Sequence, residues 1–257
     1  MRVLACLALV GCGAAGGMPD GGPPDALPSR LRLEDYIRGD RYPRLELEID
    51  MVFGYEPRSA VMADLVEGLA TVLDKPGGIA AVLDDEIESQ GADHAWTLTE
   101  LHELGHVPNY QPTGWGTITM HVLFVDGHWA MDSEGSKVLG LAFGGEHVVI
   151  FKKTIQDTCA GVPLLIRERV CTLAELGVWT HETGHLLGLV DNGLPMVTAH
   201  EDATHGAHDV SDECVMYWAY EGQDMVTLLA ERILAGNDQG LGFDAACLAD
   251  IAAVRDR

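Results

Sequence analysis

The sequence predicts an α+β fold: a mixed sheet, a long helix carrying a metal-binding motif, and a smaller helical subdomain at the C-terminal end. Residues 45–51 and 117–125 have the patterns of sheet strands, and a His-Glu-x-x-His pentad on a predicted helix follows them at 181–185. A run of strands followed by helices is typical of α+β domains.

The remaining elements follow from periodicity and from turn residues. Leu45, Leu47 and Ile49 alternate with acidic residues, as in a half-buried strand. Helical spacing predicts a helix that Pro76-Gly77-Gly78 ends. The expected elements, in chain order, are a helix at 61–73, strands at 79–83, 117–125, 139–143 and 147–155, and closing helices at 225–234 and 243–254.

The N-terminus predicts export. An apolar run ends in Leu9-Val10-Gly11-Cys12, which resembles the lipobox of bacterial lipoproteins. The resemblance implies that residues 1–11 are a signal peptide, that Cys12 is lipidated, and that the protein is held on the outward side of the cell envelope, periplasmic or cell-surface. The run is too short to span a bilayer, so the lipid is the only expected membrane contact. The alternative is an apolar N-terminus with a free cysteine.

Composition divides the rest of the chain. Residues 12–43 are rich in Gly, Pro, Ala and Asp, which predicts a flexible tether. The folded domain is expected at 44–257, with an N-terminal subdomain at 44–188 and a C-terminal subdomain at 189–257. The chain holds 40 acidic against 16 basic residues. Because such a surface repels phosphate, we expect no nucleic-acid partner. We also expect the protein to be a monomer.

Export changes how the six cysteines are interpreted. Cys6 would leave with the signal, and four cysteines would remain for two disulfides in an oxidising compartment. Of the three connectivities, we favour the one that closes a short loop and ties down the C-terminal helix. The two pairs are Cys159–Cys171 and Cys214–Cys247. A zinc site made of these cysteines is the alternative, although they lack Cys-x-x-Cys spacing.

The pentad at 181–185 carries the expected chemistry. Thr172-Leu173-Ala174-Glu175 fits a capping box, which predicts that the helix begins there. His181 and His185 lie four residues apart on one helix face, so both imidazoles can bind one zinc ion. Glu182 can take a proton from a zinc-bound water and pass it to a leaving amine.

A second pentad at His102-Glu103-Leu104-Gly105-His106 matches the same pattern. Pro108 ends its helix at once, and no glycine turn or downstream ligand set follows at a useful spacing. We interpret it as a short helix with surface histidines.

Residues beyond the first pentad extend the motif to His-Glu-x-x-His-x-x-Gly-x-x-Asp, with Gly188 and Asp191 at its end, and Met216 stands in a short apolar turn downstream. These residues resemble the zinc helix and Met-turn of metzincin peptidases, either snapalysin-like or archaemetzincin-like. The resemblance implies a metzincin-like zincin fold and a zinc metalloendopeptidase, with Met216 below the ligands. Met216 as an ordinary core methionine is the alternative.

The third zinc ligand stays open between two residues. The glycine turn at Gly188 favours Asp191, the position of aspartate in snapalysin-like members. The stretch from His208 to Met216 resembles the archaemetzincin segment between third histidine and Met-turn, and zinc prefers imidazole. We prefer Asp191 slightly and keep His208 as the alternative.

Two further stretches lie near the motif. A loop with His200, Glu201, Asp202 and His205 has donors for a second metal, or is a solvated rim. The stretch 140–151 resembles the metzincin edge strand that pairs with extended substrate.

The function predicted is cleavage of protein or peptide bonds by a single zinc ion and activated water. One alternative is a non-catalytic surface lipoprotein that binds metal or a partner on the same fold. Another is a closed structural zinc site in which His181, His185, Asp191 and His208 all bind together, which leaves no position for water.

Overall fold

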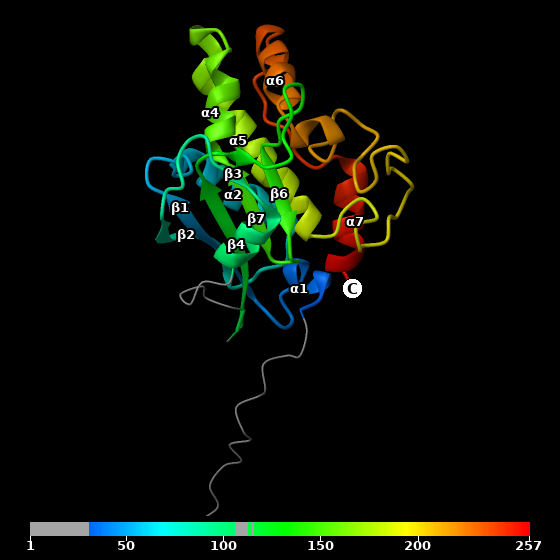
Figure 1. The fold of residues 1–257 in the computed structure, drawn as a ribbon. Coiled ribbons are helices and arrows are strands. Elements are labelled where there is room, and N and C mark those ends of the chain that lie inside the picture. The colour runs from blue at the N-terminus through cyan, green and yellow to red at the C-terminus, as the bar shows by residue number, and fades with distance from the viewer. Residues whose placement is uncertain (1–30, 106–112, 115) are drawn as a thin grey trace, which may run out of the picture. The chain divides into compact units, whose positions relative to one another are not determined.

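A five-stranded mixed sheet in the order β2-β1-β4-β7-β6 lies at the centre of the fold (Figure 1). The computed structural model describes residues 31–105, 113–114 and 116–257. All neighbouring strands are parallel except β6 and β7, which are antiparallel. The α+β class with a mixed sheet is therefore confirmed. The strands of this sheet are β1 (Arg44–Val52), β2 (Gly78–Ile87), β4 (Thr117–Val125), β6 (Gly140–Phe143) and β7 (His147–Phe151).

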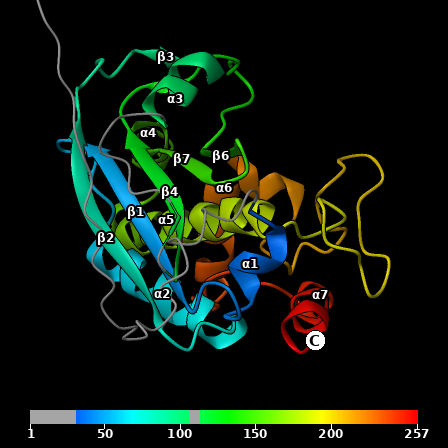
Figure 2. The ribbon, with the colours of Figure 1, turned by 90° about the horizontal axis from the view of Figure 1, so that it is seen from below.

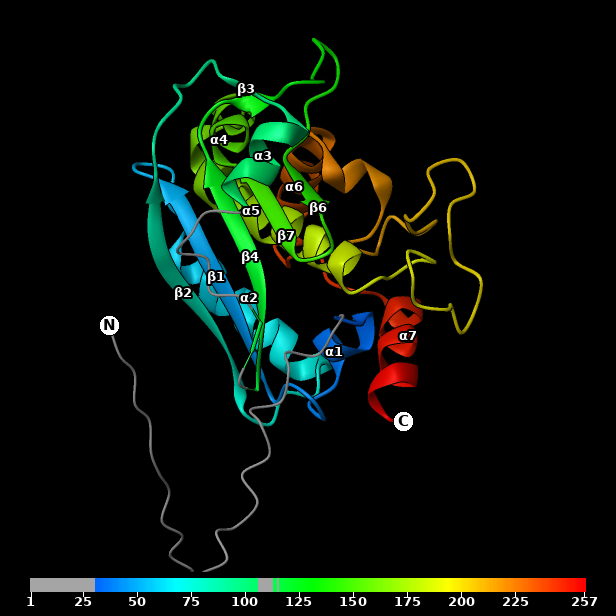
Figure 3. The ribbon, with the colours of Figure 1, turned by 60° about the horizontal axis from the view of Figure 1, so that its bottom comes forward.

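One face of the sheet packs against two helices, α2 (Ser59–Val72) and α5 (Leu164–Leu186), as Figures 2 and 3 show. Alternation in β1 directs Leu47 and Ile49 to this face, and both are fully buried. The ring of Phe124 on β4 meets that of Trp179 on α5, with 5.1 Å between their centroids. The hydrophobic face of the sheet thus holds in place α5, the helix that carries the pentad at 181–185 and is called the metal helix below.

The opposite face carries a smaller apolar cluster under α3 (Leu98–Leu104). Leu101 of α3 is buried there beside side chains from β4 and β7. Two short strands, β3 (Ala95–Trp96) and β5 (His128–Trp129), pair in parallel beside it. The second pentad lies here: His102 is on α3, half-buried, with its ring edge against Phe143, whereas His106 and Pro108 lie outside the described residues.

The metal helix begins eight residues earlier than its capping box predicts. It starts at Leu164, directly after Pro163. Thr172 lies inside the helix and donates its hydroxyl to the carbonyl of Glu168. Glu175 is fully buried and binds Arg58 and Lys152. Glu175 therefore pairs with distant side chains and does not cap the helix, so the capping-box pattern at 172–175 does not mark the start of α5.

The strand expected at 147–155 is also partly wrong. β7 ends at Phe151, and α4 (Lys152–Ala160) begins at the next residue. Lys152 and Thr154 are buried in α4, the lysine against Glu175, so this segment is buried as a helix. The disulfide Cys159–Cys171 then joins α4 to α5, with 5.9 Å between the Cα atoms, and this predicted pair is confirmed.

The chain folds earlier than the tether prediction allows. Residues 33–37 form α1 (Leu33–Ile37), and Tyr36 and Ile37 are buried. The ammonium of Lys75 donates to three carbonyls of this region, those of Asp35, Arg38 and Tyr42, at 2.6–3.0 Å. A flexible tether is therefore wrong for residues 33–43. The signal peptide, Cys12 and the tether up to residue 30 lie outside the described residues and stay predictions.

After α5 the chain forms a long loop and then three short helices (Figure 3). They are η1 (Trp218–Glu221), α6 (Asp224–Leu234) and α7 (Ala245–Arg255). Cys214 and Cys247 are buried with their sulfur atoms 3.6 Å apart and are not bonded. The expected partners meet, but their disulfide is not present. In the described part of the chain no helix has the length and apolarity to cross a bilayer.

Candidate metal centre

Three histidine rings meet at the C-terminal end of α5. His181 and His185 lie one helical turn apart, with ring centroids at 4.8 Å. His208 returns from the long loop and lies 5.2 Å from the first ring and 5.0 Å from the second. One nitrogen from each ring lies within 4.8 Å of the others, so the three imidazoles can hold one metal ion.

Backbone carbonyls orient two of these rings. Nδ1 of His181 lies 2.7 Å from the carbonyl oxygen of Val215, and Nδ1 of His208 lies 2.6 Å from that of His205. A carbonyl can only accept, so each Nδ1 carries the proton and each Nε2 offers a lone pair. Nε2 of His208 is buried and has no hydrogen-bond partner. This orphaned nitrogen, beside the facing Nε2 atoms of His181 and His185, fits a bound cation.

Burial keeps the rings of His181 and His185 neutral. Burial, reinforced by the neighbouring histidines, holds the pKa of His181 well below its ordinary value. Burial and then His208 lower the pKa of His185 to about 4. Neutral imidazole is the form that binds zinc, because protonation removes the lone pair. The two histidines of α5 are therefore in the form that binds zinc at neutral pH.

Glu182 lies beside the three rings. Its side chain is almost fully buried, and its Oε1 has no hydrogen-bond partner. A Cβ atom on Gly140 would lie 2.9 Å from Cγ of Glu182, so the glycine lets β6 pass close to this carboxyl group. Burial first, and then the charge of Glu221, raise the pKa of Glu182 well above its ordinary value. A raised pKa suits a group that accepts and returns a proton.

The glycine turn does what the sequence predicts, but it does not deliver Asp191. Gly188 has φ +79°, and the chain leaves the helix there. Asp191 is exposed and does not belong to the group formed by the three histidines. The geometry therefore brings His208, and not the preferred Asp191, together with His181 and His185. It also gives no support to a closed site of four protein ligands.

Met216 is fully buried next to the metal helix. A Cβ atom on Gly184 would meet its sulfur atom at 2.3 Å. Because Gly184 stands between the two histidines of α5, the methionine packs directly on the turn that carries them. Met216 therefore lies against the helix turn that carries His181 and His185, and its role below a metal stays a prediction.

A pocket of about 470 Å³ opens over this group. It is lined by β6 and the glycines after it, by Glu182, His185 and His208, and by Leu33, Asn192 and Glu221. β6 is an edge strand of the described sheet, as the stretch 140–151 predicts. Sequence reasoning missed Glu221, because nothing in Trp218-Ala219-Tyr220-Glu221 resembles a motif.

A second group of possible metal ligands lies near α7. It comprises His200, Asp209, Asp244 and Cys247. His200 is buried between Asp209, at 2.5 Å, and Asp250, at 2.9 Å. His205 is elsewhere: its ring stacks on Trp218. The expected polar loop thus contributes His200, and not His205, to this group. A third group, Glu48, Asp50 and Asp84, consists of carboxylates alone.

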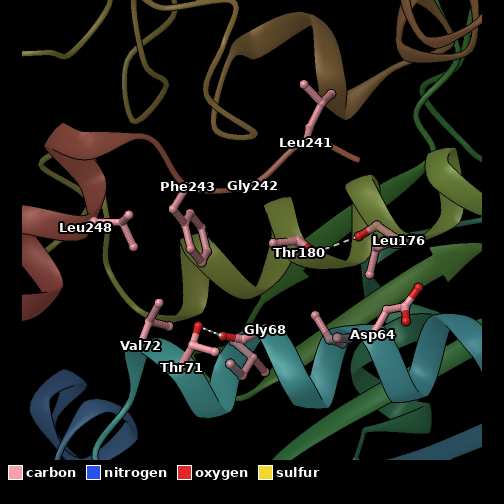
Figure 4. Close-up of a pocket in the computed structure, with 12 residues that line it drawn as sticks. Asp64, Gly68, Thr71, Val72, Leu176, Thr180, Leu241, Gly242, Phe243 and Leu248 are labelled. Atoms are coloured by element: carbon pink, nitrogen blue, oxygen red, sulfur yellow. Dashed lines mark hydrogen bonds between the residues drawn. The ribbon is translucent and has the colours of Figure 1, made fainter. Parts of the chain in front are cut away.

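Another hollow lies between α2, α5 and the segment before α7 (Figure 4). It has a volume of about 260 Å³ and is mainly apolar, and among the described residues Asp64 is the one charged side chain that lines it. Thr180 on its wall donates its hydroxyl to the carbonyl of Leu176 and not into the hollow (Figure 4). None of the groups of possible metal ligands in the described residues lies in this hollow.

Comparisons with known proteins give one structural likeness. A crystal structure of an archaemetzincin from Methanopyrus kandleri is 16% identical, covers 84% of this chain and 98% of its own, and has a TM-score of 0.49. No family model and no curated protein sequence matches the chain. The function is therefore inferred from the residues of the pocket.

Proposed function

We propose that this chain is a zinc-dependent metalloendopeptidase. The observation that carries the proposal is the three-histidine group with Glu182 in the same pocket, beside an edge strand. Zinc held by His181, His185 and His208 supplies Lewis-acid chemistry, which polarises a peptide carbonyl and lowers the pKa of water. Three protein ligands are the number that catalytic zinc sites use, so these residues would hold zinc as such a site does.

Glu182 moves the proton in this proposal. Its raised pKa makes the carboxyl group a base strong enough to accept a proton from the attacking water. The same group then donates that proton to the amine that leaves. The buried position of Glu182 limits competition from bulk water for the proton.

The edge strand binds the substrate. β6 has one side paired with β7 and lies at the end of the described sheet, so its other backbone groups can pair with an extended peptide. Leu141 and Ala142 line the pocket from this strand. An extended peptide on β6 passes Glu182 and the histidines, which places a backbone carbonyl beside them. We also propose that the protein is exported, that Cys12 carries a lipid, and that the protein is a monomer.

The test pairs zinc content with cleavage of unfolded casein by the chain and its Glu182→Gln variant. The amide keeps the shape of the side chain but is a far weaker base. We expect both proteins to hold about one zinc and only the parent to cut. A variant as active as the parent would remove Glu182 from the reaction. Zinc in both proteins and cleavage by neither would favour the non-catalytic surface lipoprotein.

A further inference from the structure

Glu221 is held firmly at the wall of the histidine pocket. It ends η1, and its backbone carbonyl accepts a hydrogen bond from the amide of Leu139 at 3.0 Å. The next residue, Gly222, forms a β-bridge with Val138. Glu221 is therefore tied on its backbone to the segment that leads into β6, and its side chain has a fixed origin.

The carboxylate of Glu221 reaches the histidines but stands outside their group. One oxygen lies 3.5 Å from Nε2 of His208, the nitrogen that lacks a hydrogen-bond partner. Glu221 is absent from the set of residues whose donor atoms all lie within 4.8 Å of one another. The side chain is 35% exposed and lines the pocket. It is thus placed to meet a substrate rather than to complete the ligand set.

The charge of the pocket is one-sided. Its lining contains two carboxylic acids, Glu182 and Glu221, and no lysine or arginine among the described residues. The acidic chain around it, at a net charge of −24, adds to the same sign. Of the two acids, Glu182 is almost fully buried, whereas Glu221 is partly exposed to the pocket, so the carboxylate of Glu221 is the one that can pair with a cationic group on a bound molecule.

Resting on the proposed peptidase function, we propose that Glu221 is a specificity residue that binds a cationic group of the substrate next to the scissile bond. In an endopeptidase substrate this cation is the side chain of a lysine or arginine beside the bond that is cut. Glu221 pairs with it through a carboxylate oxygen that faces the pocket beside His208. Neutral and acidic groups at this position lose that ion pair.

The experiment compares matched peptides that carry lysine, its neutral isostere norleucine, or glutamate on either side of the scissile bond. Each peptide has an acetylated N-terminus, so that the lysine side chain is the only cationic group beside the scissile bond. We expect kcat/KM to favour the cationic member of a pair, mainly through KM. In the Glu221→Gln variant that preference should fall about tenfold, as the loss of a charge-assisted pair implies.

Asp224→Asn is the matched control. Asp224 is an exposed acid three residues further on, outside the histidine pocket, so the variant loses the same unit of charge. It should keep the parental preference for cationic peptides. Glu221→Asp keeps a carboxylate and should retain part of that preference. This variant therefore distinguishes loss of the negative charge from damage to the folded protein. An unchanged preference in Glu221→Gln, or an equal loss in Asp224→Asn, would overturn the proposal.

Binding separates this proposal from the peptidase function itself. Calorimetry on zinc-loaded Glu182→Gln protein, with and without Glu221→Gln, measures the same peptides without turnover. Tighter binding of the cationic peptide that disappears with Glu221→Gln supports the role of Glu221 even if the parent cleaves nothing. Zinc affinity should stay at the parental value in Glu221→Gln. A loss of tenfold or more would make Glu221 a metal ligand and overturn its role in specificity.

Discussion

Replacing His208 by asparagine should remove one zinc ligand, whereas the same change at Asp191 should not. Binding free energies of about 10–16 kcal/mol for structural zinc sites of four ligands correspond to roughly 3 kcal/mol for each ligand. His208→Asn should therefore weaken zinc binding by at least about a hundredfold. His208 belongs to the histidine group, and Asp191 is exposed outside it.

Asp191→Asn is a control matched to the local backbone. Asp191 has φ +57°, in the left-handed region, and asparagine tolerates that conformation nearly as well as aspartate. Zinc affinity is measured by competition with a chromophoric chelator, and circular dichroism confirms that both variants are folded. The reasoning would be refuted if Asp191→Asn lost zinc while His208→Asn bound it like the parent.

Three further predictions concern stability and its pH dependence. Gly184→Ala places a Cβ atom against Met216 and should lower the free energy of unfolding by about 1–3 kcal/mol in urea titrations. Zinc binding should weaken as well. An unchanged free energy of unfolding would show that the methionine side chain can move aside. Breaking Cys159–Cys171 with paired serines should cost about 2–3 kcal/mol, from the entropy of a short loop, and an unchanged Tm would contradict this. Lys75→Met leaves carbonyls without their donor and should lower the free energy of unfolding by about 1–3 kcal/mol. Because burial lowers the pKa of Lys75 from 10.5 to about 8, the parent should gain stability as pH rises from 8 to 10.5, and this slope should be smaller in Lys75→Met.

Much of the fold could be predicted from local patterns. Alternation predicted β1, because its side chains divide between two faces of a sheet, and the run 117–125 with the Asp126-Gly127 turn after it predicted β4. The closing helices α6 and α7 were predicted within two residues at each end. The start of α5 could not be found in this way, because Glu175 binds Arg58, which lies more than a hundred residues earlier in the chain. A local capping pattern carries no information on such distant partners.

The site could be predicted only where it lies on one helix. His181, Glu182 and His185 have fixed spacing on α5, so their geometry follows from the helix itself. His208 comes back through a loop whose path depends on packing, including the hydrogen bond that His181 donates to the carbonyl of Val215. Glu221 lies at the pocket because the next residue, Gly222, forms a β-bridge with Val138 in the segment before β6. Tertiary contacts of this kind leave no periodic signal in the sequence.

Zinc-edge X-ray absorption on the zinc-loaded protein tests the central claim most directly. Zinc bound by His181, His185 and His208 gives three nitrogen ligands at about 2.0–2.1 Å, one light ligand from water, and no sulfur. The competing group near α7 contains Cys247, so zinc there would show sulfur at about 2.3 Å. Imidazole scattering from three rings without sulfur would support the account. A sulfur shell, or four protein ligands with no water, would contradict it.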